Sequence, residues 1–194
     1  MTPQEAKLYD TQPDHPDLDE EGRKGLWIHT YTGNKFWAFD PRPEEIHIED
    51  IAHALALTCR YSGHCHEFYS VAQHSWLVSN LVPLKDAAWG LLHDAAEAYI
   101  TDIPRPIKHS LGIIKDIERG IEQAVAARFK LSGDVPDTVH HIDHNIVHDE
   151  AKVLFPDGGP EWVNWYEPLG LTIEPWDWKT AEQKFLERYE ELFN

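Results

Sequence analysis

The chain has 194 residues, of which 42% are hydrophobic, and a formal net charge of −17. This length and apolar content predict one compact domain with a sizeable core. So acidic a surface repels a phosphate backbone, which disfavours nucleic acid as a partner but leaves open a small anion bound through a metal ion.

The sequence contains no apolar run of membrane-spanning length, and "MTPQEAKLYD" lacks the features of an export signal. Cys59 and Cys65 do not follow a C-x-x-C pattern, so neither a disulfide framework nor a cysteine-based zinc site is expected. We therefore expect no membrane partner and a location in the cytoplasm, either of a bacterium or of a phage-infected host.

The N-terminal region is predicted to contain little regular structure. Residues 1–24 are polar, acidic and proline-bearing, which is typical of a flexible arm. Aromatic residues then surround a Thr-Gly-Asn turn at residues 32–34, which predicts a short hairpin that forms a flap. Residues 25–194 are expected to form the single domain.

From residue 48 onward the apolar residues recur at helical spacing. The segments expected to be helical are residues 48–62, 70–82, 86–100, 113–129, 138–155 and 179–193. No segment alternates as a buried strand would, so the predicted fold is an all-α bundle. The tail before the last helix holds Trp162, Trp165, Trp176 and Trp178. They are interpreted first as packing beneath the C-terminal segment and second as a surface for a homo-oligomer.

The third expected helix carries three ionisable residues, His93, Asp94 and Glu97, among Ala and Leu. His93 and Glu97 are four residues apart and share one face of the helix. A lone histidine on such a helix is more often a satisfied core residue. The adjacent Asp94 changes this interpretation, because a buried carboxylate needs a cation and residues 87–102 contain no Lys or Arg.

A divalent metal ion would supply this cation, and two further ligands are available on other helices. His74 lies in the apolar segment "SVAQHSWLV", and a helical wheel of residues 138–155 turns Asp143 toward the apolar face. His141, His144 and His148 fall on the opposite, polar face. Imidazole and carboxylate ligands together suit zinc, manganese, iron or cobalt.

The order H…HD…D resembles the HD-domain metal-dependent phosphohydrolases, and the local sequence is similar to their 5′-deoxynucleotidase (YfbR-like) branch. The motifs that carry the resemblance are "IEDIAHALALTCRYSGHCHEFYSVAQHSWLVS", "LLHDAAEAYITDIPRPIK" and "DHNIVHDEAKVLF". They cover residues 46–155, more than half of the chain. The resemblance implies an HD-type helical bundle with a divalent metal ion, which is Co, Mn, Zn, Fe or Mg.

The resemblance also implies roles for individual residues. His74, His93, Asp94 and Asp143 match the metal ligands. Glu97 matches the catalytic carboxylate that handles the attacking water, and Asp102 matches a residue near the sugar and the water network. Arg60 matches the arginine that grips the substrate phosphate, with Lys108 as a looser candidate for the same task. His64 and His66 are candidates for donating a proton to the leaving group.

The sequence departs from the family pattern in two places. The stretch between His74 and His93 is short, which predicts a tight connection between their helices. Tyr61 follows the phosphate-binding arginine, where some members carry another aromatic residue, so base and sugar selectivity are left open.

These observations favour hydrolysis of 2′-deoxynucleotides, with release of phosphate from 5′-monophosphates, as the leading hypothesis. The first alternative keeps the site but changes the bond, and is a deoxynucleoside triphosphate (dATP-type) triphosphohydrolase like the small phage enzymes. The second alternative is a nucleotide-binding regulator whose metal is structural. A nucleic-acid phosphodiesterase is disfavoured by the acidic charge.

Overall fold

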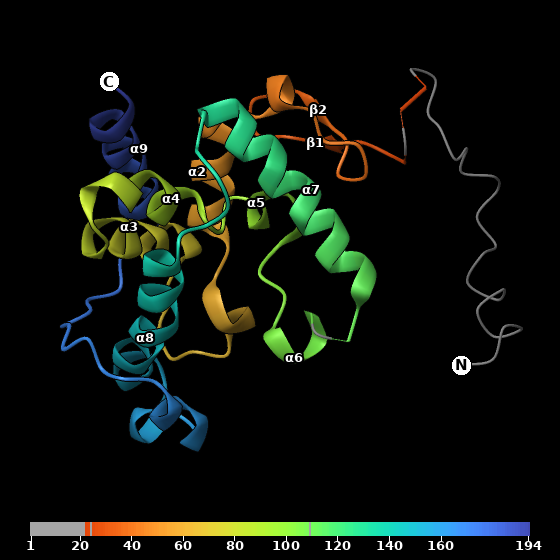
Figure 1. Ribbon diagram of the computed structural model, residues 1–194. Helices are drawn as coiled ribbons and strands as arrows, with labels where there is room; N and C mark the ends of the chain where they lie inside the picture. Colours follow the sequence, from red (N-terminus) through yellow and green to blue (C-terminus); the bar gives the residue numbers. More distant parts are fainter. Residues whose placement is uncertain (1–21, 24, 109) are drawn as a thin grey trace, which may run out of the picture.

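The computed structural model describes residues 22, 23, 25–108 and 110–194 and shows an all-α protein with one small hairpin (Figure 1). The helices are α2 (Ile48–Leu57), α3 (Val71–Leu81), α4 (Ala87–Leu92), α5 (Glu97–Ile100), α6 (Arg105–Lys108), α7 (Gly112–Phe129), α8 (Asp137–Leu154) and α9 (Trp178–Phe193). The all-α prediction is confirmed. Within the described part of the chain, no helix is both long enough and apolar enough to cross a membrane.

The expected flap is a two-stranded antiparallel hairpin. Strand β1 (Ile28–His29) pairs with β2 (Lys35–Phe36), with Ile28 opposite Phe36. Phe36 is fully buried and stacks on Tyr99, with 3.8 Å between the ring centroids. Tyr31, in the turn of the hairpin, stacks in the same way on His53 of α2, also with 3.8 Å between the ring centroids. The hairpin is therefore anchored to the helices through two aromatic side chains.

Arg23 lies near the end of the predicted N-terminal arm and packs against the domain. Residues 1–21 and 24 lie outside the described part of the chain. Arg23 is buried, and its guanidinium donates to the carboxylates of Glu45 and Asp40, each at 2.5 Å. Arg23 therefore belongs to the folded domain, because a buried cation with two carboxylate partners is held in place.

The core is built around α3, which packs against α4 and α9. Ser70 caps the N-terminus of α3, and its hydroxyl accepts a hydrogen bond from the Gln73 amide at 3.1 Å. Gly90 in α4 faces Ser79, and a Cβ atom at Gly90 would lie 2.8 Å from the Ser79 Cα. Helices α3 and α4 thus approach closely because residue 90 has no side chain, and this contact brings His74 and His93 together.

The third expected helix is interrupted where the ionisable residues begin. Helix α4 ends at Leu92 and α5 begins at Glu97. Between them the backbone tightens to i→i+3 hydrogen bonds, such as the Ala95 amide to the Leu92 carbonyl at 3.0 Å. The His93 side chain bonds to the Gly90 carbonyl at 2.9 Å, which occupies an acceptor of the last α4 turn. Helical periodicity did not predict this change.

The C-terminal tryptophans lie in different environments. Trp176 packs edge-on against Trp76, with ring centroids 5.1 Å apart, as expected for packing beneath the tail. Trp165, in contrast, is 82% exposed. The expectation of a homo-oligomer stays a prediction.

Candidate metal centre

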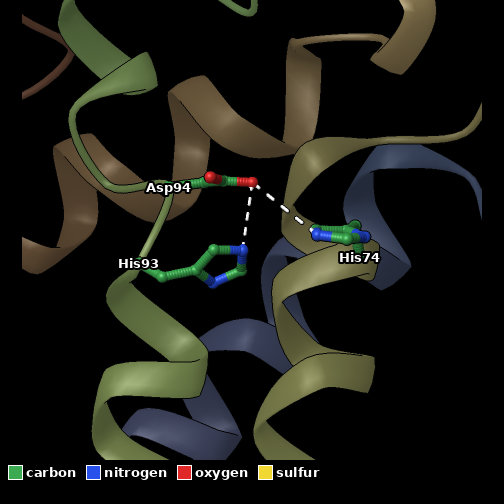
Figure 2. Close-up of side chains that lie close together, drawn as sticks. All are labelled: His74, His93 and Asp94. Atoms are coloured by element: carbon green, nitrogen blue, oxygen red, sulfur yellow. Dashed lines mark ion pairs between the residues drawn. The ribbon is translucent and has the colours of Figure 1, made fainter. Parts of the chain in front are cut away.

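Three segments bring the predicted metal ligands to one place. Helix α3 provides His74, the turn between α4 and α5 provides His93 and Asp94, and α8 provides Asp143. Figure 2 shows Asp94 reaching toward both imidazoles, with Oδ2 at 3.3 Å from His93 Nε2 and 3.7 Å from His74 Nε2. Asp143 Oδ1 lies 3.1 Å from His74 Nε2 and 3.8 Å from His93 Nε2. The four side chains therefore converge on one point.

Hydrogen bonds on the far side of each ring orient both imidazoles. His93 Nδ1 lies 2.9 Å from the Gly90 carbonyl, and His74 Nδ1 lies 2.7 Å from a Glu150 carboxylate oxygen. A carbonyl and a carboxylate can only accept, so both Nδ1 atoms carry the proton. In the neutral rings, each Nε2 then presents a lone pair toward the carboxylates of Asp94 and Asp143.

This arrangement fits a divalent cation. Within the described structure, His93 Nε2 is buried and has no hydrogen-bond partner. His74, His93 and Asp94 each offer one ligand atom, and these atoms lie within 4.8 Å of one another, so the three residues can hold a metal ion. Histidine Nε2 ligands whose Nδ1–H bonds to a carboxylate or a carbonyl are typical of metal sites in proteins.

The electrostatics of the centre also favour a positive charge. Burial by itself lowers the pKa of His93, but the charges of Asp94 and Asp143 together outweigh it and raise that pKa well above its ordinary value. Burial acts to raise the pKa of Asp94, but His93 lowers it to about 2. The carboxylates of Asp94 and Asp143 thus stay ionised beside the two imidazoles. Their negative charges attract a cation to the centre.

Glu97 lies one turn beyond His93 and is buried. Its Oε2 atom has no hydrogen-bond partner among the described residues, and its Oε1 atom lies 4.0 Å from Lys108 Nζ. Burial raises the pKa of Glu97 well above its ordinary value, and the charges of Asp94 and Asp102 add to this effect. A buried carboxylate with a raised pKa and an unpartnered oxygen is a candidate for proton transfer.

Arg60 lies at the edge of the centre in a tight loop that precedes α3. Its guanidinium is 3.6 Å from Asp94 Oδ2 and 3.3 Å from Glu150 Oε2. Burial lowers the pKa of Arg60, but the charges of Glu150, Asp94 and Asp143 together outweigh burial and raise that pKa above its ordinary value. Tyr61 and Ser62 have positive φ angles of 56° and 53°, a backbone conformation that L residues rarely adopt.

An open pocket of about 550 Å³ adjoins this loop. One side is formed by residues next to Arg60, and the other by the segment that follows α5. The lining residues are Leu57, Thr58, Cys59, Ser62, Gly63, Thr101, Asp102, Ile103 and Pro104. Among these described lining residues, Asp102 has a carboxylate and the others are neither acidic nor basic.

The remaining predicted residues lie around the centre at different depths. Lys108 forms an ion pair with Glu118, so its charge is already partnered. The Tyr61 hydroxyl donates to Glu150 Oε2 at 2.5 Å, which turns this side chain toward α8. His64 and His66 are exposed, and His64 follows directly after Gly63 of the pocket lining. Their predicted roles toward a substrate stay predictions.

The structure also shows a residue that our sequence reasoning missed. Glu150 is fully buried, and its carboxylate accepts hydrogen bonds from His74 and from two tyrosine hydroxyls. It is seven residues after Asp143 on α8, which places the two side chains about 20° apart on a helical wheel. The wheel that turned Asp143 inward therefore contained the signal for Glu150 as well.

Comparison with known proteins gives relatives but no named activity. None of the protein-family models matches the chain. The chain is 38% identical over 136 residues to the uncharacterized protein YfdR of Escherichia coli, covering 70% of this chain and 76% of YfdR. It is 35% identical over 123 residues to an uncharacterized protein of Rhodobacter capsulatus, covering 58% of this chain and 63% of that relative. The extent of the first match shows that the chain belongs to the same family as YfdR.

Proposed function

We propose that this protein is a metal-dependent phosphohydrolase that releases phosphate from 5′-deoxynucleotides. The observation that carries the proposal is the convergence of two imidazole Nε2 atoms, both with their Nδ1 atoms engaged elsewhere, on the carboxylates of Asp94 and Asp143. The resemblance to HD-domain phosphohydrolases supports the reaction class. His74, His93, Asp94 and Asp143 would hold the metal.

The residues around the ion suit hydrolysis of a phosphate ester. A bound divalent metal ion supplies Lewis-acid polarisation of the phosphate and lowers the pKa of water. Glu97 accepts or orients the proton of the attacking water, since its Oε2 atom has no partner within the described structure. Arg60 presents donors toward the non-bridging oxygens and stabilises the negative charge that develops on them.

The distribution of cations supports a monophosphate rather than a triphosphate. Arg60 and Lys108 are the predicted phosphate-binding cations, and both already face carboxylates. The adjoining pocket is lined in the described structure by Asp102 and uncharged side chains. Asp102 suits a hydroxyl of the sugar, whereas a second and third phosphate would meet a carboxylate there without a compensating cation.

The proposal is tested with protein stripped of metal by a chelator and reloaded with Mn²⁺ or Co²⁺. Mono-, di- and triphosphates of the four deoxynucleosides are incubated with it, and chromatography separates phosphate from pyrophosphate and triphosphate. We expect the reloaded protein, but not the metal-free protein, to convert the monophosphates to phosphate and nucleoside. Release of triphosphate would instead identify the triphosphohydrolase.

Glu97→Gln separates an enzyme from a regulator with a structural metal. This substitution preserves the volume of the side chain and should lower kcat by about 10²–10⁴-fold while the metal stays bound. Glu190→Gln, an exposed position on α9, is the matched control and should leave kcat unchanged. Metal binding by the wild type without hydrolysis of any nucleotide would refute the enzymatic proposal and favour the regulator.

A further inference from the structure

Glu150 contacts two parts of the candidate site, the metal ligand His74 and the loop that carries Arg60, and it uses a different carboxylate oxygen for each. Its Oε1 atom accepts from His74 Nδ1 at 2.7 Å and from the Tyr69 hydroxyl at 3.0 Å. Its Oε2 atom accepts from the Tyr61 hydroxyl and from Arg60 at 3.3 Å. One buried carboxylate therefore faces a metal ligand on one side and the phosphate-binding loop on the other.

We propose that Glu150 is a positioning residue that fixes the His74 imidazole for metal binding and orients Arg60 for the phosphate. The inference rests on the metal site of the proposed function and adds a residue that links its two parts. Through Oε1, Glu150 keeps the proton of His74 on Nδ1 and leaves Nε2 free to bind a cation. Through Oε2, it orients Arg60 beside Asp94.

The surroundings of Glu150 show why a carboxylate is needed at this position. It is fully buried, and an ionised carboxylate without partners would be strongly destabilising there. Arg60 and the protonated Nδ1 atom of His74 are donors that cannot accept at those atoms. Two oxygens, both acceptors, satisfy them at once, and the tyrosine hydroxyls occupy the remaining lone pairs.

Glu150→Gln tests this requirement, because an amide of nearly the same size has one acceptor and one donor end. If the amide oxygen faces His74, its NH₂ group opposes the donor of Arg60. If the oxygen faces Arg60, the NH₂ group opposes His74 Nδ1 and drives the proton of that ring to Nε2, where the metal should bind. Either orientation damages one half of the site.

The experiment measures binding rather than turnover. Isothermal calorimetry gives the Kd for Mn²⁺ alone and the Kd for inorganic phosphate in the presence of Mn²⁺. Loss of a partner that orients a metal ligand typically weakens metal binding about 10–100-fold. We expect Glu150→Gln to weaken binding of Mn²⁺ to this degree, to weaken binding of phosphate, or both. Wild-type values for both constants would overturn the inference.

Asp149→Asn is the matched control, because it removes the same charge one residue earlier in α8. Asp149 is also buried, but its carboxylate accepts from the Leu169 amide at 2.8 Å and lies 3.2 Å from Lys152, away from the ligands. The control should lose stability and keep both binding constants. Equal losses in the two variants would mean that Glu150 is only structural, and would overturn the inference.

A second measurement on the wild-type protein decides the question even if Glu150→Gln does not fold. Long-range ¹H–¹⁵N correlation spectra of the metal-free protein report which nitrogen of neutral His74 carries the proton. We expect the Nδ1–H form, and the Nε2–H form would overturn the inference. This outcome is separate from the fate of the proposed function, since hydrolysis can be present or absent with His74 in either form.

Discussion

Replacing Gly90 by alanine should destabilise the protein, although alanine is the better helix former. In an α-helix interior alanine is favoured over glycine by about 0.5–1 kcal/mol. At position 90, however, the added Cβ would lie 2.8 Å from the Cα and 3.1 Å from the amide nitrogen of Ser79. Overpacking a well-packed core costs about 1–3 kcal/mol, and here the obstructing atoms are backbone atoms that move only with α3.

The difference between the two ranges is about 0–2.5 kcal/mol, and the clash with backbone atoms places the net loss for Gly90→Ala in its upper part, at about 1–2 kcal/mol. For a chain of this size it corresponds to a fall in Tm of about 2–8 °C. Thermal unfolding followed by circular dichroism in chelator measures this loss without a contribution from bound metal. Because α3 carries His74 and α4 leads into His93, the affinity for Mn²⁺ should fall in the same variant.

Gly120→Ala in α7 is the matched control, with the opposite expected sign. A Cβ at this position would meet the Pro41 side chain at 3.7 Å, which is an ordinary contact. This variant should gain up to about 1 kcal/mol of stability through the propensity of alanine. If Gly90→Ala is as stable as Gly120→Ala, the close approach of α3 and α4 is not what places the two histidines.

Two further predictions concern local interactions. Ser70→Ala removes the hydroxyl that caps α3 by accepting from the Gln73 amide. Unfolding in urea should show a loss of about 1 kcal/mol in the free energy of unfolding. An unchanged value would show that the cap contributes nothing. Burial, and to a smaller extent the charge of Glu118, raises the pKa of Glu122 from 4.5 to about 7. Between pH 4.5 and about pH 7, the folded state therefore keeps a proton on Glu122 that the unfolded state has released. Stability therefore falls as pH rises through this window, and Glu122→Gln should stabilise the metal-free protein at pH 8 but not at pH 4.5. An equal effect at both pH values would contradict the raised pKa.

The sequence predicted the parts of the site that depend on helical periodicity. His74, His93 and Asp94 stand out in the sequence because they interrupt apolar stretches, and Asp143 stands out because the helical wheel turns it inward. These four side chains meet in the structure, where α3, α8 and the turn after α4 bring them together.

What the sequence did not predict depends on contacts between side chains and distant segments. The break after Leu92 arises where the His93 ring bonds to the Gly90 carbonyl, a competition that periodicity does not register. The helical wheel turns Glu150 inward beside Asp143, but it does not show that the partners of Glu150 lie on α3 and the preceding loop. Local composition places Arg23 in a polar arm, whereas its partners Asp40 and Glu45 lie 17 and 22 residues further along the chain.

The most direct test of the central claim is anomalous scattering from crystals of the Glu97→Gln protein soaked with Mn²⁺ and a deoxynucleoside 5′-monophosphate. The proposal predicts one strong Mn²⁺ peak within bonding distance of His74 Nε2, His93 Nε2 and the carboxylates of Asp94 and Asp143, with the phosphate between the ion and Arg60. A Mn²⁺ peak elsewhere, or an empty centre at saturating metal, would contradict it.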